Sequence, residues 1–244
     1  MEETGKNPIQ VAERLFQVIE RLAENGPMGI MDLSAELGFH KSTTHRLVTS
    51  LQYMGYIRQD EESLKYALSL KFLEIGSKIL EQTNMASLIH PSLKKLSEQT
   101  GETVHLVRRE GTEAVYIDKV ESTVSSIRMV SRVGSRIPLY CSGVGKALLA
   151  ELPDPEIEDI WNSSEITSLT PYTVTSLSDL MDRIRGVREA GFAMDDEENE
   201  EGVRCIAVSI PDYHKEPVYA LSISAPVSRM TDSRIAELSP DVLT

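Results

Sequence analysis

Residues 33–47, LSAELGFHKSTTHRL, indicate how the N-terminal part of this 244-residue chain folds. Its first half places Leu33 and Leu37 on one face of a short helix, and Gly38 gives the sharp exit that a helix C-terminus prefers. A second helix begins almost at once, at Lys41, and its opening turns are polar and basic. Because such a turn can enter the major groove of DNA, the stretch predicts a helix-turn-helix.

Elements on both sides extend this prediction to a winged helix-turn-helix. An amphipathic helix of about 14 residues precedes it, with Val11, Leu15, Ile19 and Leu22 at helical spacing. The second helix of the motif runs from residue 41 to 54 and turns Leu47, Leu51 and Met54 inward. Two strand-like runs, residues 56–58 and 65–68, flank an acidic turn and predict a hairpin. Phosphates repel acids, so we expect the tip of this hairpin, residues 60–63, to stay clear of DNA.

The polar opening of the second helix supplies the candidate contacts to DNA. Arg46 is the first choice for base readout, because a guanidinium can reach both acceptors of a guanine, and Lys41 suits a phosphate. The alternative is a three-helix corner whose polar turn merely faces water, and the hairpin favours the DNA-reading interpretation. The predicted DNA-binding residues are Lys41, Ser42, Thr43, Thr44, His45 and Arg46.

Composition and charge limit the kind of protein this is. The formal net charge of −13 argues against a protein that coats nucleic acid nonspecifically, since that mode needs Lys and Arg on phosphates. Residues 37–59 nevertheless contain no acid, so a locally basic surface remains. No apolar run reaches the roughly 18 residues of a membrane-spanning helix, and the chain opens with acids rather than a signal peptide. We expect a cytoplasmic protein with no membrane partner.

The remainder of the chain predicts a linker and an α/β domain. A helix over residues 70–80, with Leu73 and Ile79 on its apolar side, leads to a break at residues 82–84. Helices are expected over residues 88–100, 142–152 and 177–190, and strands over 103–108, 113–120, 126–130, 205–210 and 219–224. A last helix starts near residue 231, and Pro240 should interrupt it. The expected class is α+β, with a DNA reader at 1–67, a linker at 68–84 and a sensor with an antiparallel sheet at 85–244.

Longer motifs resemble the isocitrate lyase regulator (IclR) family of bacterial transcription factors. The N-terminal likeness runs through residues 33–38, 41–47, 51 and 55–56, and the more specific C-terminal likeness through 135–150, 191–199 and 202–207. The resemblance implies a GAF-like effector-binding domain after the winged reader, and a tetramer built from two dimers. Two departures stand out: Ala67 occupies a wing position that is often basic in the family, and the C-terminal helix is short.

A turn that enters the helix after residue 142 is the candidate anion site. The free N–H groups of Gly143 and Val144 and the positive end of the helix dipole favour a carboxylate there. A bulky residue at 143 should then fill the ligand's space without preventing folding. The alternative is an ordinary strand-to-helix turn. A Walker loop is excluded, because Tyr140 and Ala147 occupy positions that need Gly and a hydroxyl.

The family resemblance nominates further pocket residues. It implies an acidic residue at Asp195, a small neighbour at Cys205, and hydroxyls at Ser222 and Ser224 on one face of the last strand. The complete predicted effector site is Met129, Ile137, Gly143, Val144, Asp195, Cys205, Ser222 and Ser224. For the acidic run at residues 196–201, a solvated loop is the simpler interpretation. A solvated or ion-paired side chain is the simpler interpretation of the lysine at 146.

An enzyme is the competing interpretation. Cys141 or Cys205 could act as a nucleophile beside His90, His105 or His214, or carboxylates could hold a metal, but no catalytic or metal-ligand signature surrounds them. We therefore expect no cofactor, no metal and no catalytic residue. The expected function is a DNA-binding transcription regulator, a repressor, that responds to a small carboxylate effector of a catabolic operon. One reading helix buries too little surface for specific affinity, so a homodimer on double-stranded operator DNA, or a dimer of dimers, is expected.

Overall fold

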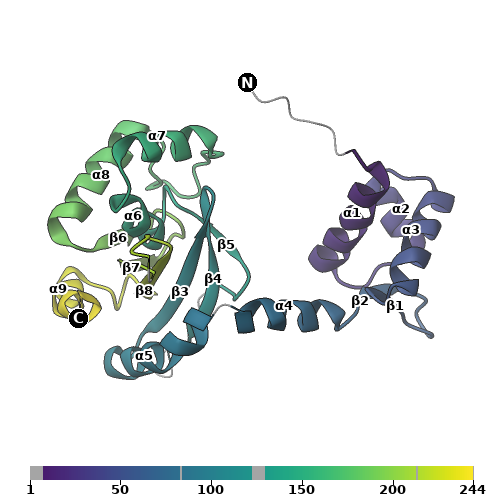
Figure 1. Cartoon of the computed structure of the whole chain (residues 1–244), viewed down its shortest axis with the longest axis horizontal. Coiled ribbons are helices and arrows are strands. Elements are labelled where there is room, and N and C mark those ends of the chain that lie inside the picture. Colours follow the sequence, from purple (N-terminus) through teal and green to yellow (C-terminus); the bar gives the residue numbers. More distant parts are fainter. Residues whose placement is uncertain (1–7, 83, 123–129, 213, 244) are drawn as a thin grey trace. The chain divides into compact units, whose positions relative to one another are not determined.

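The structure is a computed structural model that describes residues 8–82, 84–122, 130–212 and 214–243. The chain divides into two compact units, residues 1–82 and 83–244, whose elements are labelled in Figure 1. Among the described residues, no helix is long and apolar enough to cross a membrane. The two units are described separately.

The N-terminal unit is the expected winged helix-turn-helix. Its helices are α1 (Gln10–Asn25), α2 (Ile30–Leu37), α3 (Lys41–Tyr53) and α4 (Lys71–Gln82), and its hairpin is β1 (Ile57–Gln59) and β2 (Tyr66–Leu68). One apolar cluster draws on α1, α2, α3 and both strands, because the apolar stripe of each helix turns to the same centre. Its buried members are Val18, Leu22, Met28, Leu33, Leu47, Val48, Leu51, Ile57 and Tyr66.

The turn between α2 and α3 is set by Gly38. Its φ of 65° lies in the left-handed region that favours glycine, and its N–H donates to the carbonyl of Ala35. The next N–H, of Phe39, donates to the carbonyl of Ser34, and the Ser34 hydroxyl donates back to the carbonyl of Phe39 at 2.6 Å. These bonds satisfy the last carbonyls of α2 and fix the direction in which α3 leaves.

The start of α4 is tied to the end of α3. The Lys71 ammonium donates to the carbonyl of Met54 at 2.7 Å and lies 4.3 Å from the centre of the Tyr56 ring. Phe72 packs on the same ring, with 5.3 Å between ring centroids. This cation–π and aromatic contact joins α4 to the base of the wing.

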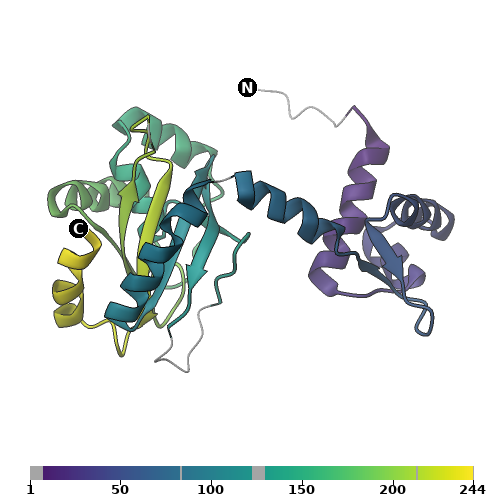
Figure 2. The same cartoon turned by 60° about the horizontal axis from the view of Figure 1, so that its bottom comes forward.

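The C-terminal unit is an antiparallel sheet covered on both faces. The sheet order is β5 (Arg136–Pro138), β4 (Glu113–Val120), β3 (Thr103–Glu110), β8 (Tyr219–Pro226), β7 (Val203–Ile210) and β6 (Ala193–Asp196). Helices α6 (Gly143–Ala150), α7 (Asp154–Ser163) and α8 (Leu177–Ala190) contribute to one apolar cluster, and α5 (Asn84–Thr100) and α9 (Asp232–Leu243) to the other. Figures 1 and 2 show these helices on opposite sides of the sheet.

The pleat of the sheet decides what each face carries. Along β3, Val104 and Leu106 belong to the α5 and α9 cluster, so His105 and Val107 point to the α6 face. Along β8, Leu221 and Ile223 likewise point to α5 and α9. The alternate positions on β8 therefore lie on the α6 face, where polar side chains would be costly unless they met partners or a ligand.

The fold confirms the expected winged reader and antiparallel α/β domain, with local differences. Helix α7 and the short strands β5 and β6 were not predicted, and the expected strand at 126–130 lies mostly outside the described residues. Met54 and Leu73 were expected to face inward, but their exposures are 39% and 67%. Val11 also belongs to the exposed side of α1, at 59%.

The last helix corrects the expectation for Pro240. Helix α9 continues through it to residue 243 rather than stopping there. Proline removes the N–H that would normally reach the carbonyl of Ala236, and the Ser239 hydroxyl donates to that carbonyl at 3.3 Å. Leu238 and Val242 remain in the core on either side of it. The apolar contacts and the substitute hydrogen bond offset the cost of the proline.

Candidate functional site

The opening of α3 presents most of the predicted DNA-binding side chains to solvent. Lys41, Ser42, His45 and Arg46 are exposed, and Thr43 is half-buried. No acid occupies the first turn of α3, and the first turn of a helix is where acids most often gather. This part of the helix can therefore approach a polyanion without a local charge penalty.

The structure corrects the prediction that Thr44 contacts DNA. Its side chain is fully buried, and its hydroxyl donates to the carbonyl of His40 at 3.3 Å. Helical periodicity places it on the same side as Leu47 and Val48, both in the core of the unit. Its side chain cannot reach DNA while α3 is packed, so its role is structural.

The hairpin tip is ordered by its own acids. The Asp60 carboxylate accepts from the Ser63 N–H at 2.8 Å and from the Ser63 hydroxyl at 2.7 Å. These hydrogen bonds lower the pKa of Asp60 below its ordinary value, so the tip keeps its negative charge. That charge supports the prediction that the tip stays away from phosphates.

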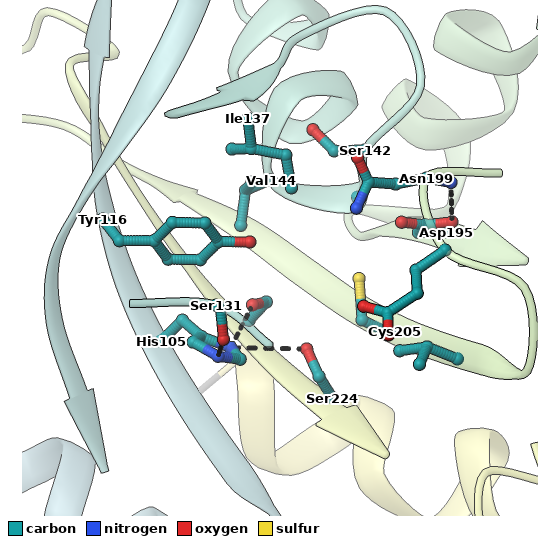
Figure 3. A pocket seen from close by; sticks show the side chains of 14 residues that line it. His105, Tyr116, Ser131, Ile137, Ser142, Val144, Asp195, Asn199, Cys205 and Ser224 are labelled. Carbon is teal, nitrogen blue, oxygen red and sulfur yellow. Dashed lines mark hydrogen bonds between the residues drawn. The ribbon is translucent and has the colours of Figure 1, made fainter. Parts of the chain in front are cut away.

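The C-terminal unit contains a pocket between the sheet and the start of α6, which we call the α6 pocket (Figure 3). Its empty volume, which includes space open to solvent, is about 430 Å³. Strand register brings its polar residues together: Asp195 on β6 lies opposite Cys205 on β7, which lies opposite Ser224 on β8. One strand along, His105 on β3 lies opposite Ser222 on β8.

Seven of the eight predicted effector residues line this pocket, and Met129 lies outside the described residues. The seven are Ile137, Gly143, Val144, Asp195, Cys205, Ser222 and Ser224. Sequence reasoning missed the other lining residues, His105, Tyr116, Ser131, Ser142, Asn199, Glu200 and Val203. Alternation along a strand puts His105 and Val107 on one face of β3. It does not predict which strands pair with β3, and so the sequence alone did not indicate that His105 lines the pocket.

Ser142 caps α6 and prepares its N-terminus. Its hydroxyl oxygen accepts from the N–H of Gly145 at 3.1 Å and donates to the carbonyl of Pro138 at 2.6 Å. Among the described residues, the N–H of Val144 has no hydrogen-bond acceptor, and it lies in the first turn at the positive end of the helix dipole. The pocket therefore contains one built-in position for an acceptor atom.

Gly143 and Gly145 are required by packing rather than by ligand access. A Cβ on Gly143 would lie 2.6 Å from the Cys205 sulfur, and a Cβ on Gly145 would lie 2.2 Å from the carbonyl oxygen of Leu139. A bulky residue at 143 would thus strike β7 before it filled the pocket. This corrects the expectation that such a replacement would leave folding intact.

His105 lies at the centre of a hydrogen-bonded group of hydroxyls. Its Nε2 is 2.8 Å from the Ser131 hydroxyl, and its Nδ1 is 3.4 Å from the hydroxyls of both Ser222 and Ser224. Burial, together with the nearby ammonium of Lys119, lowers the pKa of His105 to about 3. The imidazole is therefore neutral at physiological pH, with one nitrogen as donor and the other as acceptor.

Asp195 is the buried acid of the pocket. Its Oδ1 accepts from the N–H of Glu198 at 2.8 Å, which folds the segment after β6 back over the sheet. Burial raises the pKa of Asp195 to about 7, against the opposing effect of Lys146. The carboxyl group is thus poised to gain or lose a proton near neutral pH.

A buried ion pair supports the pocket from behind and corrects the interpretation of the acidic run. Lys146 on α6 pairs with Glu198, and each side chain is no more than 2% exposed. The hydroxyl of Thr173 donates to the carbonyl of Glu198 at 2.7 Å, so residue 198 is held on both sides. Residues 196–201 are therefore not simply a solvated loop, since Glu198 lies in the core; only Asp196 and Glu201 are exposed.

The thiols show no sign of activation. Burial raises the pKa of Cys141 to about 12 and that of Cys205 above its usual range. A nucleophilic cysteine needs the opposite shift. Within the described ranges, no group of three or more His, Cys, Asp or Glu residues is arranged to hold a metal ion.

Comparison with known proteins places the two units in one family. Residues 11–61 match the IclR helix-turn-helix domain, and residues 77–244 match the family described as bacterial transcriptional regulator IclR C-terminal. The acetate operon repressor of Salmonella typhimurium is 37% identical over 238 residues, which cover 96% of this chain and 86% of that protein. The DNA-binding transcriptional repressor YiaJ of Escherichia coli is 39% identical over 221 residues, covering 89% and 78%.

Solved structures agree with the sequence comparisons. The crystal structure of the Thermotoga maritima IclR matches with a TM-score of 0.80 at 32% identity, covering 96% of this chain and 94% of that one. The named relatives are transcription regulators and not enzymes, which decides against the enzyme interpretation. The chain therefore belongs to the IclR family of bacterial transcription regulators and is a DNA-binding regulator.

Proposed function

We propose that this regulator is a cytoplasmic repressor of a catabolic operon. Its affinity for operator DNA changes when a small organic acid occupies the α6 pocket. The relatives named as repressors support the sign of the regulation. The observation that carries the proposal is the α6 pocket itself, where a helix N-terminus and hydroxyls from β8 converge in the unit that does not contain the reading helix. A ligand there can act only through its different affinity for two states of the protein.

The carboxylate of the effector would accept from the N–H of Val144 at the start of α6. Ser222 and Ser224 would donate further hydrogen bonds, since their hydroxyls line the same pocket and can rotate between His105 and a ligand. Helix N-termini bind anions in this way throughout proteins. The remaining lining residues then decide which acid fits.

We further propose that the reading unit works as a homodimer, alone or within a dimer of dimers. Two-fold related α3 helices would reach half-sites about one helical turn apart, or a multiple of it. Large apolar side chains left exposed on the N-terminal unit support a contact with a second copy. On and beside α1 and α4 these are Ile9, Val11, Phe16, Leu70 and Leu73.

The proposal is tested with the full chain and the DNA flanking its own gene. Footprinting should reveal a protected site with two-fold symmetry, and small organic acids should change the affinity for it in a gel-shift titration. Binding to DNA without any dependence on organic acids would overturn the effector proposal. Protection of one unsymmetrical half-site would overturn the dimer.

A further inference from the structure

The α6 pocket places a buried carboxyl group beside the start of α6. The Asp195 side chain is 7% exposed and lines the same hollow as Gly143 and Val144. The backbone nitrogen of Asp195 lies 3.4 Å from the position that a Cβ on Gly143 would take. Figure 3 shows the Asp195 carboxyl group across the hollow from Tyr116 and His105. An acid bound at the first turn of α6 would therefore meet a second carboxyl group.

The lysine behind the pocket does not remove this conflict between two acids. Lys146 is paired with Glu198, and each side chain is no more than 2% exposed. Arg183, on α8, also approaches the Glu198 carboxylate, at 4.0 Å, but it is 55% exposed and water screens its charge. The described lining of the pocket contains neither lysine nor arginine. Lys146 attracts the Asp195 carboxylate, but one ammonium cannot balance Glu198, Asp195 and a bound anion together.

The hydrogen bonds of Asp195 determine which of its oxygens can take a proton. Oδ1 accepts from the backbone N–H of Glu198 at 2.8 Å and from that of Asn199 at 3.4 Å. In the part of the chain that the structure describes, Oδ2 has no hydrogen-bond donor. A proton on Oδ2 therefore breaks no hydrogen bond, and the resulting O–H can donate to a carboxylate oxygen of a ligand. The neutral acid attracts an anion that the ionised acid would repel.

Among the groups with a shifted pKa around this pocket, Asp195 is the one whose pKa lies near neutrality. Burial raises the pKa of Asp195 to about 7, whereas burial lowers that of His105 to about 3 and raises that of Cys141 to about 12. Burial also raises the pKa of Cys205 and of Tyr116 above its usual range. The titratable or charged groups on the elements around Asp195 are Cys141 before α6, Lys146 on α6, Arg183 on α8, Glu198 and Glu200 after β6, Cys205 on β7, His105 on β3, and Tyr116 and Lys119 on β4.

We infer that an acid effector enters the α6 pocket together with one proton, which Asp195 takes from solvent and holds on Oδ2, facing the effector carboxylate. This inference rests on the proposed function, because it describes how the same effector site is regulated. Two carboxylates that share a buried site cannot both stay ionised, so protonation of Asp195 and binding of the anion favour each other. The effector itself stays ionised, and the protein gains the proton. The regulator therefore responds more strongly to a given concentration of acid as the pH falls.

Titration calorimetry on the full chain counts this proton. The probes are acetate, pyruvate and gluconate, each measured at pH 8 in HEPES and in Tris, two buffers with different ionisation enthalpies. The heats should differ between the buffers by the uptake of about one proton per ligand, and the affinity should fall about tenfold from pH 6 to pH 8. Equal heats and a pH-independent affinity would overturn the inference and leave the acid effector standing. Binding of none of the acids at either pH would overturn the acid effector and this inference with it.

Asp195→Asn separates the proton from the structural role of the side chain. The amide oxygen can still accept from the Glu198 N–H, and the amide nitrogen can donate to a ligand as the protonated acid would. At pH 8 this variant should bind the preferred acid about tenfold more tightly than wild type, without proton uptake. Glu200→Gln, which removes the other acid of the pocket lining, is the matched control and should keep the wild-type proton uptake. Loss of uptake in Glu200→Gln alone would place the proton on Glu200 and overturn the assignment.

A measurement on the ligand-free wild-type chain depends on neither probe nor variant. With ¹³C in the aspartate carboxyl groups, NMR should show an aspartate that titrates near pH 7. Absence of any aspartate titration between pH 6 and pH 8 would overturn the inference.

Discussion

The pH dependence of the free energy of unfolding of the C-terminal unit should include two opposing contributions that nearly cancel. His105 is buried in its neutral form, with its pKa lowered to about 3, while burial of Asp195 raises its pKa to about 7. As pH falls below about 6.5, the unfolded chain protonates its histidine and the folded chain does not, so His105 makes stability fall. Over the same range the folded chain holds a proton on Asp195 that the unfolded chain has lost, so Asp195 makes stability rise.

Each titration is worth about 1.4 kcal/mol per pH unit while the two states differ by one proton. Between pH 5.0 and 6.5 the wild-type contributions should therefore cancel. In Asp195→Asn only the histidine effect remains, and stability relative to wild type should rise by about 2 kcal/mol across that interval as pH increases. In His105→Gln it should fall by about the same amount.

Denaturant unfolding followed by tryptophan fluorescence measures these slopes. Trp161 is the one tryptophan in the chain and packs against Tyr140 in the α6 cluster, with ring centroids 5.9 Å apart, so it reports on the C-terminal unit. The double variant of Asp195 and His105 is the control and should recover the wild-type profile. Single variants whose pH profiles run parallel to wild type would refute the reasoning, whatever their absolute stability.

Four further predictions concern the reading helix and the start of α6. Arg46→Ala should cost about 1–3 kcal/mol on the operator and relax specificity at one base pair, whereas Lys41→Ala should weaken all sequences alike and reduce the salt slope by about one; gel shifts at several salt concentrations separate the two. Thr44→Val should lower the free energy of unfolding by about 1 kcal/mol and leave operator affinity unchanged. A loss of affinity at equal folded fraction would mean that Thr44 does contact DNA. Gly143→Ala should destabilise by about 1–3 kcal/mol, because its Cβ meets the Cys205 sulfur at 2.6 Å. Adding Cys205→Ala should recover most of that loss in thermal unfolding, and no recovery would contradict the packing role.

Local signals predicted the reading unit well because its contacts are close in sequence. Gly38, the polar start of α3 and the acidic turn of the hairpin each act within a few residues of themselves. Thr44 was misassigned because the six residues were taken together as the start of a reading helix, although position 44 shares its helical face with Leu47 and Val48.

The pocket was only partly predictable, because its two walls come from strands far apart in the chain. The resemblance supplied Asp195, Ser222 and Ser224, but His105 joins them only through the pairing of β3 with β8. Glu198 was misread for a similar reason. A run of acids is normally solvated, and only the fold shows that Lys146, 52 residues earlier, removes one of them from water.

The joint between α3 and α4 has a mechanical consequence. Lys71 and Phe72 hold the first turn of α4 on the Tyr56 ring and on the carbonyl of Met54, the C-cap of α3, and these contacts resist bending at the joint. A rotation of α4 about its axis would therefore change the orientation of α3, the reading helix, rather than unwind the first turn of α4. The coupling is reciprocal: DNA that holds α3 in one orientation would also fix the direction in which α4 leaves the unit.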